Sequence, residues 1–250
     1  MMRSGGFRLR RFIGWCLICF WPFVLLAQST QGDTISKTTK VWPSLPNSHG
    51  VFLVPTGLGL EKGDFSYQNF TLFLHQIQYG ASDEFSIGLT FEWLTLLAAI
   101  DSMRPYSPAF SLNPKVSIPI GKDEWHLGLG ALFMEIPDTD VFMDLGFVLG
   151  TLTYGKQDRN ISMGIGFGLI EGGFSVQPIL LFSAQYRISR RWAFVTENGW
   201  IPNPFFGFSN TGIRLLGKRI HWDVGLTAVG VSGEMAQQLP MLGLILPFGR

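Results

Sequence analysis

The chain has 250 residues, of which 46% are hydrophobic, 14% aromatic and only 15% charged, and its formal net charge is +1. Soluble domains carry about 25% charged residues and about 7% Gly, so a chain with this little charge and 30 Gly does not have the composition of an ordinary soluble enzyme. The aromatic content excludes a disordered chain, and the lack of a clustered basic face argues against nucleic-acid binding.

Residues 1–27 are predicted to be a secretory signal peptide. Four Arg and no acidic residue lie in residues 1–11, and an unbroken apolar run follows from Phe12 to Leu26. This order of a charged, an apolar and a small-residue region is typical of export signals. An uncleaved anchor is the alternative, although the apolar run is short for a membrane-spanning helix.

Cleavage after residue 27 would remove both cysteines of the chain, Cys16 and Cys19. The mature chain would then have no disulfide, no thiolate metal site and no Cys nucleophile. Cleavage would also remove four of the 19 basic residues and none of the 18 acidic ones, which changes the formal charge from +1 to −3. The polar residues 28–49 are expected to be a periplasmic lead-in, and residues 50–250 the folded domain.

The folded domain shows strand periodicity. Between Ile161 and Leu169, bulky apolar residues fill the odd positions, and Ser162 and three Gly fill the even ones. Such period-two alternation predicts β-strands with one apolar and one small or polar face. In a soluble sandwich the apolar face would pack in a core, whereas in a transmembrane barrel it meets lipid and the polar face lines the lumen.

Three features favour the transmembrane barrel. Short charged turns alternate with connections of a different chemistry, as in outer-membrane barrels with short periplasmic turns. The strands are long enough to cross the hydrocarbon layer at a tilt, and Trp and Tyr lie near strand ends, where interfacial aromatic girdles occur. The short charged turns are 82–84, 121–124, 156–160, 189–191 and 217–219.

We therefore expect an all-β fold, a transmembrane antiparallel up-and-down β-barrel of about twelve strands. Ten strands are the alternative, because Pro55 and Gly57 interrupt the first predicted strand. An even number would place both termini in the periplasm. Local kinks are expected at Pro114, Pro119, Pro178 and Pro247. The predicted strands are 51–60, 65–80, 84–97, 108–120, 124–136, 141–155, 160–170, 176–188, 191–201, 206–216, 219–229 and 239–248.

The opening of the domain carries a family resemblance. The segments that carry the resemblance are Val54–Gly57, Leu60–Asp64, Tyr67–Asn69 and Tyr79–Gly88. They resemble the first hairpin and turn of a group of uncharacterised outer-membrane barrel proteins common in Bacteroidetes. The resemblance implies a barrel and brings no catalytic residues. The alternating apolar residues that end on Phe248 resemble the C-terminal signal read by the barrel assembly machinery, which is an expected partner together with outer-membrane lipid.

The charged and polar residues on the small face are candidates for the lining of the lumen. Their mixed signs indicate either a lumen filled by paired side chains or a weakly selective pore. The candidates are Glu92, Lys115, His126, Asp144, Gln185, Arg187, Glu197, Arg214, His221 and Asp223.

No motif in the sequence predicts catalysis, a cofactor or a metal. The four His are far apart and the Gly-x-Gly repeats lie inside predicted strands, where they cannot form a phosphate loop. A lipid-modifying enzyme of the outer leaflet remains an alternative, with His75 as its candidate. The first expectation is a porin-like or small-solute transport protein in the outer membrane of a Gram-negative bacterium, and the second is a sealed structural or partner-binding barrel.

Overall fold

The computed structural model describes most of the chain after residue 44. The predicted signal peptide and most of the lead-in lie outside the described residues. No helix among the described residues is long and apolar enough to cross a membrane. The described residues are 45, 47–71, 73–92, 109–121, 124–135, 145–170, 173–201, 206–231, 234–235 and 238–248.

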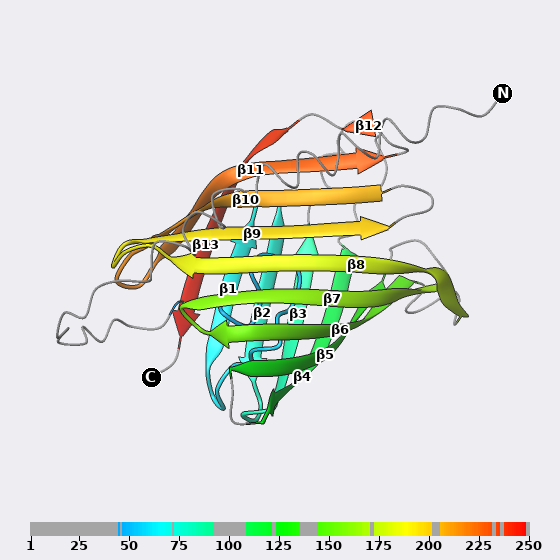
Figure 1. The fold of residues 1–250 in the computed structure, drawn as a ribbon, viewed down its shortest axis with the longest axis horizontal. Helices are drawn as coiled ribbons and strands as arrows, with labels where there is room; N and C mark the ends of the chain where they lie inside the picture. The colour runs from blue at the N-terminus through cyan, green and yellow to red at the C-terminus, as the bar shows by residue number, and fades with distance from the viewer. Residues whose placement is uncertain are drawn as a thin grey trace.

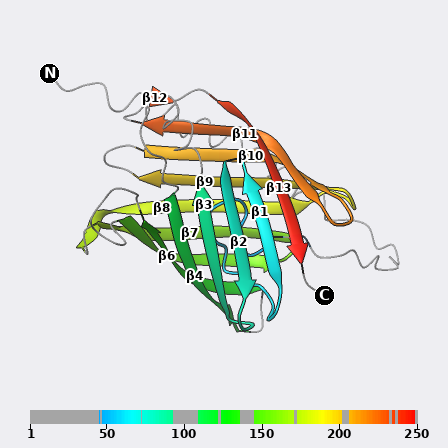
Figure 2. The same ribbon diagram turned by 180° about the vertical axis from the view of Figure 1, so that it is seen from behind.

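The described residues form an all-β closed barrel of twelve antiparallel strands with up-and-down connections, as predicted (Figures 1 and 2). The barrel closes where the first strand pairs with the last, and the two-residue β12 is an addition at the end of β11. The strands are β1 (Phe65–Phe70), β2 (Leu74–Gly80), β3 (Phe85–Glu92), β4 (Ala109–Ile120), β5 (Trp125–Glu135), β6 (Leu145–Lys156), β7 (Arg159–Ile170), β8 (Gly173–Arg187), β9 (Trp192–Ile201), β10 (Phe206–Leu216), β11 (His221–Val231), β12 (Glu234–Met235) and β13 (Leu239–Phe248).

The two faces of the wall follow the alternation of the sequence. In β11, Trp222, Val224 and Leu226 are 43%, 48% and 51% exposed, whereas His221 and Asp223 are 8% and 1% exposed. The same division recurs around most of the barrel, so the outer surface is mostly apolar and the inner one mostly polar. A mostly apolar exterior of this size needs a lipid solvent.

The five short charged turns lie at one end of the barrel, as predicted. They connect β2 to β3, β4 to β5, β6 to β7, β8 to β9, and β10 to β11. We call this the charged-turn end. Of the predicted kinks, that at Pro178 coincides with a register shift in the pairing of β7 with β8, between Phe167 and Leu169.

Two predicted strands are wrong. Residues 65–80 form two strands rather than one, because the chain reverses between Phe70 and Leu74, and Thr71 has a φ of 56° there. Residues 51–60 form no strand of the wall. The total remains twelve because one predicted strand divides and another is lost.

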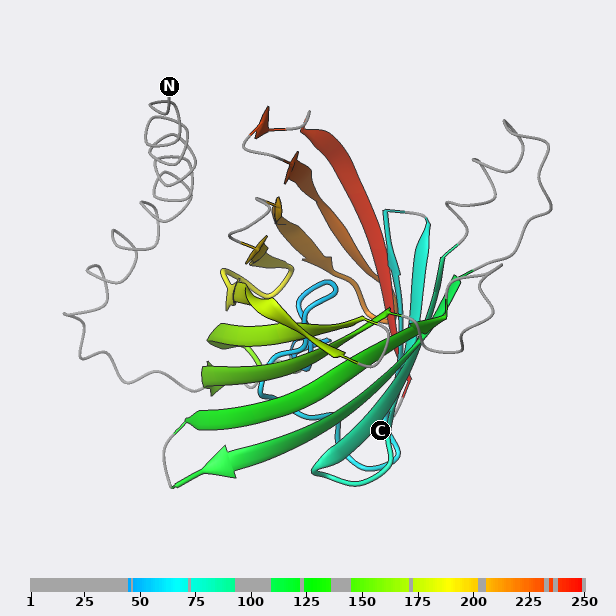
Figure 3. The ribbon, with the colours of Figure 1, turned by 90° about the vertical axis from the view of Figure 1, so that its right-hand side faces the viewer.

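The lost strand belongs to a hairpin inside the barrel (Figure 3). We call residues 47–58 the inner hairpin. Its arms meet at an isolated antiparallel bridge between Gly50 and Pro55, and the Thr56 N–H donates to the His49 carbonyl at 2.9 Å. Asn47 and Ser48 are already buried, so the expected domain boundary at residue 50 lies within this hairpin.

The inner hairpin enters from the charged-turn end. The N–H of Leu45 donates to Asp158, in the β6–β7 turn, at 3.0 Å. After the hairpin, the N–H of Gly63 donates to the carbonyl of Gly80 at 2.8 Å. The segment therefore begins and ends at one mouth of the barrel, and its tip lies deeper, level with the middle of β9.

Candidate functional site: the occupied lumen

Glu197 anchors the tip of the inner hairpin. It lies mid-way along β9 on the face that points inward, and its side chain is fully buried. One carboxylate oxygen accepts hydrogen bonds from the N–H groups of Phe52, Leu53 and Val54 at 2.9, 3.0 and 2.9 Å. Three donors aimed at one carboxylate stabilise its charge away from water, because hydrogen bonds to charged groups are the strong ones.

A buried ion pair contacts the same tip from the neighbouring wall. Arg214 and Asp223 stand opposite each other on β10 and β11. The guanidinium donates to both carboxylate oxygens, at 2.7 Å from Nε and 2.9 Å from Nη2. Nη2 also donates to the carbonyl of Val51 at 2.8 Å. The pair thus neutralises itself and still binds the hairpin backbone.

Lys115 on β4 joins the two arms of the hairpin. Its buried ammonium donates to the carbonyl of His49 at 2.8 Å and also to the carbonyl of Leu58. One residue nearer the tip, the N–H of Gly57 donates to the Thr153 hydroxyl of β6 at 2.7 Å. Together with the hairpin contacts from β9 and β10, these bonds tie the hairpin to the wall on opposite sides of the lumen.

An apolar cluster holds the tip in addition to these polar contacts. Val51 and Phe52 of the hairpin pack against Phe70, Val195 and Met241 of the wall. The rings of Phe52 and Phe70 have their centroids 5.4 Å apart. These wall residues lie on the inner face of β1, β9 and β13, so the lumen has an apolar patch within a polar lining.

Glycines allow the closest approach between hairpin and wall. A Cβ on Gly57 would lie 2.4 Å from the carbonyl oxygen of His126, and a Cβ on Gly128 would lie 2.8 Å from the carbonyl oxygen of Thr56. Both distances are too short for a side chain. The absence of a side chain at Gly128 of β5 therefore leaves space for the hairpin backbone.

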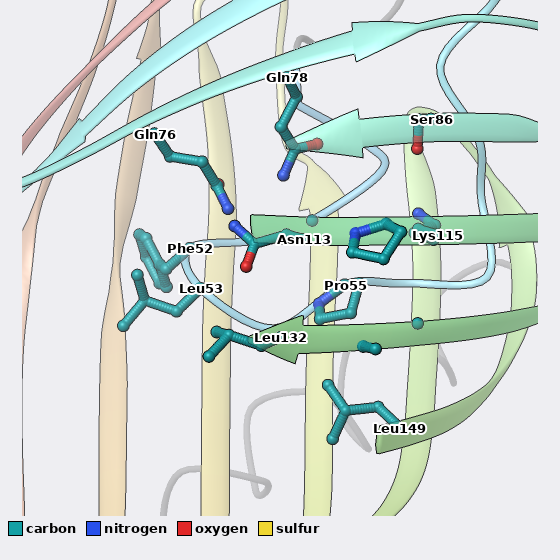
Figure 4. A pocket seen from close by; sticks show the side chains of 14 residues that line it. Phe52, Leu53, Pro55, Gln76, Gln78, Ser86, Asn113, Lys115, Leu132 and Leu149 are labelled. Carbon is teal, nitrogen blue, oxygen red and sulfur yellow. The ribbon is translucent and has the colours of Figure 1, made fainter. Parts of the chain in front are cut away.

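A small cavity of about 40 Å³ remains between the hairpin and the wall (Figure 4). Phe52, Leu53 and Pro55 line it on the hairpin side, and Gln76 and Asn113 are among the residues of the facing wall. A cavity of this size holds a few water molecules. With the hairpin in place, this space is too small for a sugar or an amino acid.

The predicted lumen candidates fall into three groups. Lys115, Glu197 and Arg214 contact the inner hairpin directly, and Asp223 does so through its pairing with Arg214. The second group, Gln185 and Arg187, lies near the charged-turn end. Gln185 donates to the carbonyl of Gln157 at 3.1 Å, and the Arg187 Nε lies 3.7 Å from Asp158. Both side chains of this second group are buried.

The third group lies at other places on the wall. Glu92 is half-buried at the last position of β3, His126 is half-buried beside Gly57, and His221 is buried at the start of β11. Asp144 lies outside the described residues.

Sequence reasoning missed Thr153 and the apolar patch of Phe70, Val195 and Met241. A signal for the patch exists in the pattern. In β1, Phe70 follows Ser66 and Gln68 on the inner face, and in β13 Met241 occupies the face opposite to exposed Leu242. Bulky apolar residues on a face that is otherwise polar indicate that something packs against them from inside.

His75, the candidate of the enzyme alternative, lies on the outer face of β2. Its Nδ1 lies 2.7 Å from the Tyr67 hydroxyl, and its ring stacks on Phe91 with centroids 4.7 Å apart. These contacts hold the ring between neighbouring strands and leave the enzyme alternative untested. Within the described ranges, no group of three His, Cys, Asp or Glu could hold a metal ion.

Comparisons with known proteins find no matching family model and no matching curated protein. Two porins are among the similar solved structures. The KdgM porin has 8% identity and a TM-score of 0.49, over 74% of this chain and 98% of that one. The NanC porin has 9% identity and a TM-score of 0.48, over 75% of this chain and 99% of that one. Another similar structure is the KdgM porin in complex with disordered oligogalacturonate. Likeness of this degree assigns neither a family nor an activity to the chain.

Proposed function

We propose that this chain is an outer-membrane barrel with a porin-like role in the passage of small solutes, and that the inner hairpin closes its pore. One observation carries the proposal: the wall leaves enough room in the lumen for two antiparallel chain segments. Small eight-stranded barrels fill their interior with wall side chains, whereas wider barrels enclose a channel. Here the filling is supplied by a segment that is not part of the wall.

The space occupied by the hairpin sets the width of the pore. Paired chains lie about 4.8 Å apart, so with the side chains included, a hairpin takes up roughly 10 Å. A passage of this width admits small hydrated solutes. The wall around it offers Gln68, Gln76 and Asn113 beside charges of both signs, which is a lining that water can wet.

A sealed structural or partner-binding barrel is the second candidate. The observation in its favour is the number of buried hydrogen bonds that tie the hairpin to Glu197, Arg214 and Lys115. The two candidates differ in whether the hairpin leaves the lumen. The location in a Gram-negative outer membrane, with the charged-turn end in the periplasm, belongs to the same proposal.

Planar-bilayer recording of the purified full chain tests the choice. In Gly57→Val the new side chain would overlap the His126 carbonyl, so we expect the hairpin to leave its place and conductance steps to appear. Gly50→Ala is the matched control in the same hairpin, because its Cβ would have an ordinary contact of 3.4 Å. The wild type and the control should be closed for most of the time.

The sealed-barrel candidate predicts a different result. Gly57→Val that folds, as judged by heat-modifiable mobility in electrophoresis, would then show no conductance steps at all. That outcome would contradict the transport proposal.

A further inference from the structure

The charged side chains that hold the inner hairpin contact its backbone, and not its side chains. Glu197 accepts from three consecutive N–H groups, and Arg214 and Lys115 donate to carbonyl oxygens. Thr153 accepts from one further N–H group. The wall therefore forms hydrogen bonds with backbone groups that any peptide carries. A turned or extended peptide can present these groups at the same spacings.

We propose that the lumen is a binding site for peptide backbones, which the inner hairpin occupies as an intramolecular ligand, and that short peptides are the solute class that binds there when the hairpin leaves. This inference rests on the proposed function for the access of solutes to the site. Glu197 would accept hydrogen bonds from N–H groups of the peptide, and Arg214 and Lys115 would donate hydrogen bonds to its carbonyl groups.

The apolar patch adds a preference to this backbone recognition. Phe70, Val195 and Met241 surround Val51 and Phe52 of the hairpin. A peptide with two adjacent apolar residues would fill the same space and bury apolar area there, which contributes favourable free energy. We therefore expect apolar dipeptide units to bind better than polar ones.

Other small solutes fit this site less well. A simple anion would lie against the Glu197 carboxylate, and a polyol would place hydroxyl groups on Phe70, Val195 and Met241. Burial of a hydroxyl group without a hydrogen-bond partner costs free energy. A peptide satisfies both the charged groups and the patch.

The test uses two full-chain variants with an altered hairpin and an unchanged wall. Gly57→Val removes the close approach to His126, and Leu53→Pro removes one N–H that donates to Glu197. The second variant keeps the test valid if the first fails to fold. Neither residue belongs to a strand of the barrel.

The probe is a synthetic peptide with the sequence of residues 47–58, Asn-Ser-His-Gly-Val-Phe-Leu-Val-Pro-Thr-Gly-Leu. Its matched control carries N-methyl groups at the residues equivalent to Phe52, Leu53 and Val54, which removes the three donors to Glu197. Binding of fluorescent versions to the detergent-solubilised variants is measured beside blockage of their conductance in bilayers.

We expect the unmodified peptide to bind and to block conductance reversibly, and the methylated peptide to bind roughly tenfold more weakly or worse, because hydrogen bonds to a charged group are lost. Equal binding of the two peptides, or no binding of either, would overturn the inference. Peptide binding without any conductance steps would support the peptide site and reject the transport role. Conductance steps without peptide binding would support the transport role and reject the peptide site.

Discussion

Glu197 is the residue on which the closed lumen depends most directly. Its carboxylate has three N–H donors from the hairpin tip. A carboxylate offers two acceptor oxygens, whereas the amide of Gln offers one and adds two donors of its own. One oxygen, Oε2, accepts all three bonds, and the other, Oε1, lies 3.2 Å from the Leu53 N–H. Gln would therefore offer those donors an acceptor without the negative charge, and its NH₂ group would face the Leu53 N–H.

Glu197→Gln should release the hairpin tip, because the amide NH₂ group would face backbone donors. The measurement is the rate of thiol labelling of a Phe52→Cys reporter, since Phe52 is only 1% exposed in the closed lumen. We expect a labelling rate at least several-fold higher with Glu197→Gln. Glu84→Gln, at an exposed turn position, is the control and should leave the rate unchanged. Equal rates in both variants would contradict the anchoring role.

Arg214 and Asp223 form the second buried charge site. Arg214→Met would leave Asp223 in the lumen without its cation, and removal of one partner of a buried pair costs about 3–5 kcal/mol. We expect a matching loss in the free energy of unfolding by urea in detergent micelles, followed by Trp fluorescence. The double variant Arg214→Met/Asp223→Leu should recover much of this loss. A single variant as stable as the wild type would show that water solvates the lone carboxylate.

Among the elements of the fold, the wall could be predicted from sequence and the inner hairpin could not. Alternation reports which face of a strand meets lipid, as β11 shows by its exposed Trp222 and buried Asp223. The hairpin contains the continuous apolar run Val51–Val54, which has no such alternation. Its partners Glu197 and Arg214 lie 145 and 163 residues further along the chain, and local patterning carries no information on such contacts.

The candidate site could be predicted in part for the same physical reason. The alternation of the sequence predicts which charged side chains face the lumen. It therefore identifies Lys115, Glu197, Arg214 and Asp223 as lumen residues. Their common partner could not be predicted, because they bind backbone groups, which every residue has. The reversal between β1 and β2 was also hidden, since Thr71 has no turn preference and neither Gly nor Pro is near it.

The β1–β2 turn contains strain that a substitution should relieve. Thr71 has a φ of 56°, a conformation that is unfavourable for a β-branched residue. Thr71→Gly should therefore increase the free energy of unfolding by about 1 kcal/mol, measured by urea titration. Thr71→Ala, which keeps a Cβ, should not give this gain. A decrease with Gly would mean that the Thr71 hydroxyl bond to the Phe70 carbonyl outweighs the strain.

At the scale of the whole molecule, the barrel combines an outer face suited to contact with lipid and a lumen whose side chains bind a polypeptide backbone. The outer face is mostly apolar, and the lumen presents charges of both signs beside an apolar patch. Because the chain supplies its own occupant from the charged-turn end, the proposed opening would need the movement of one short hairpin, and the twelve wall strands could keep their pairing.

Closure of the pore by the hairpin is tested most directly by conductance with the hairpin locked in place and then released. In a Glu197→Gln background, cysteines replace Phe52 and Phe70, whose ring centroids are 5.4 Å apart, and a short reducible thiol cross-linker joins them. We expect no conductance steps in the cross-linked protein and clear steps after reduction of the same sample. Equal current before and after reduction would show that the hairpin does not close the pore.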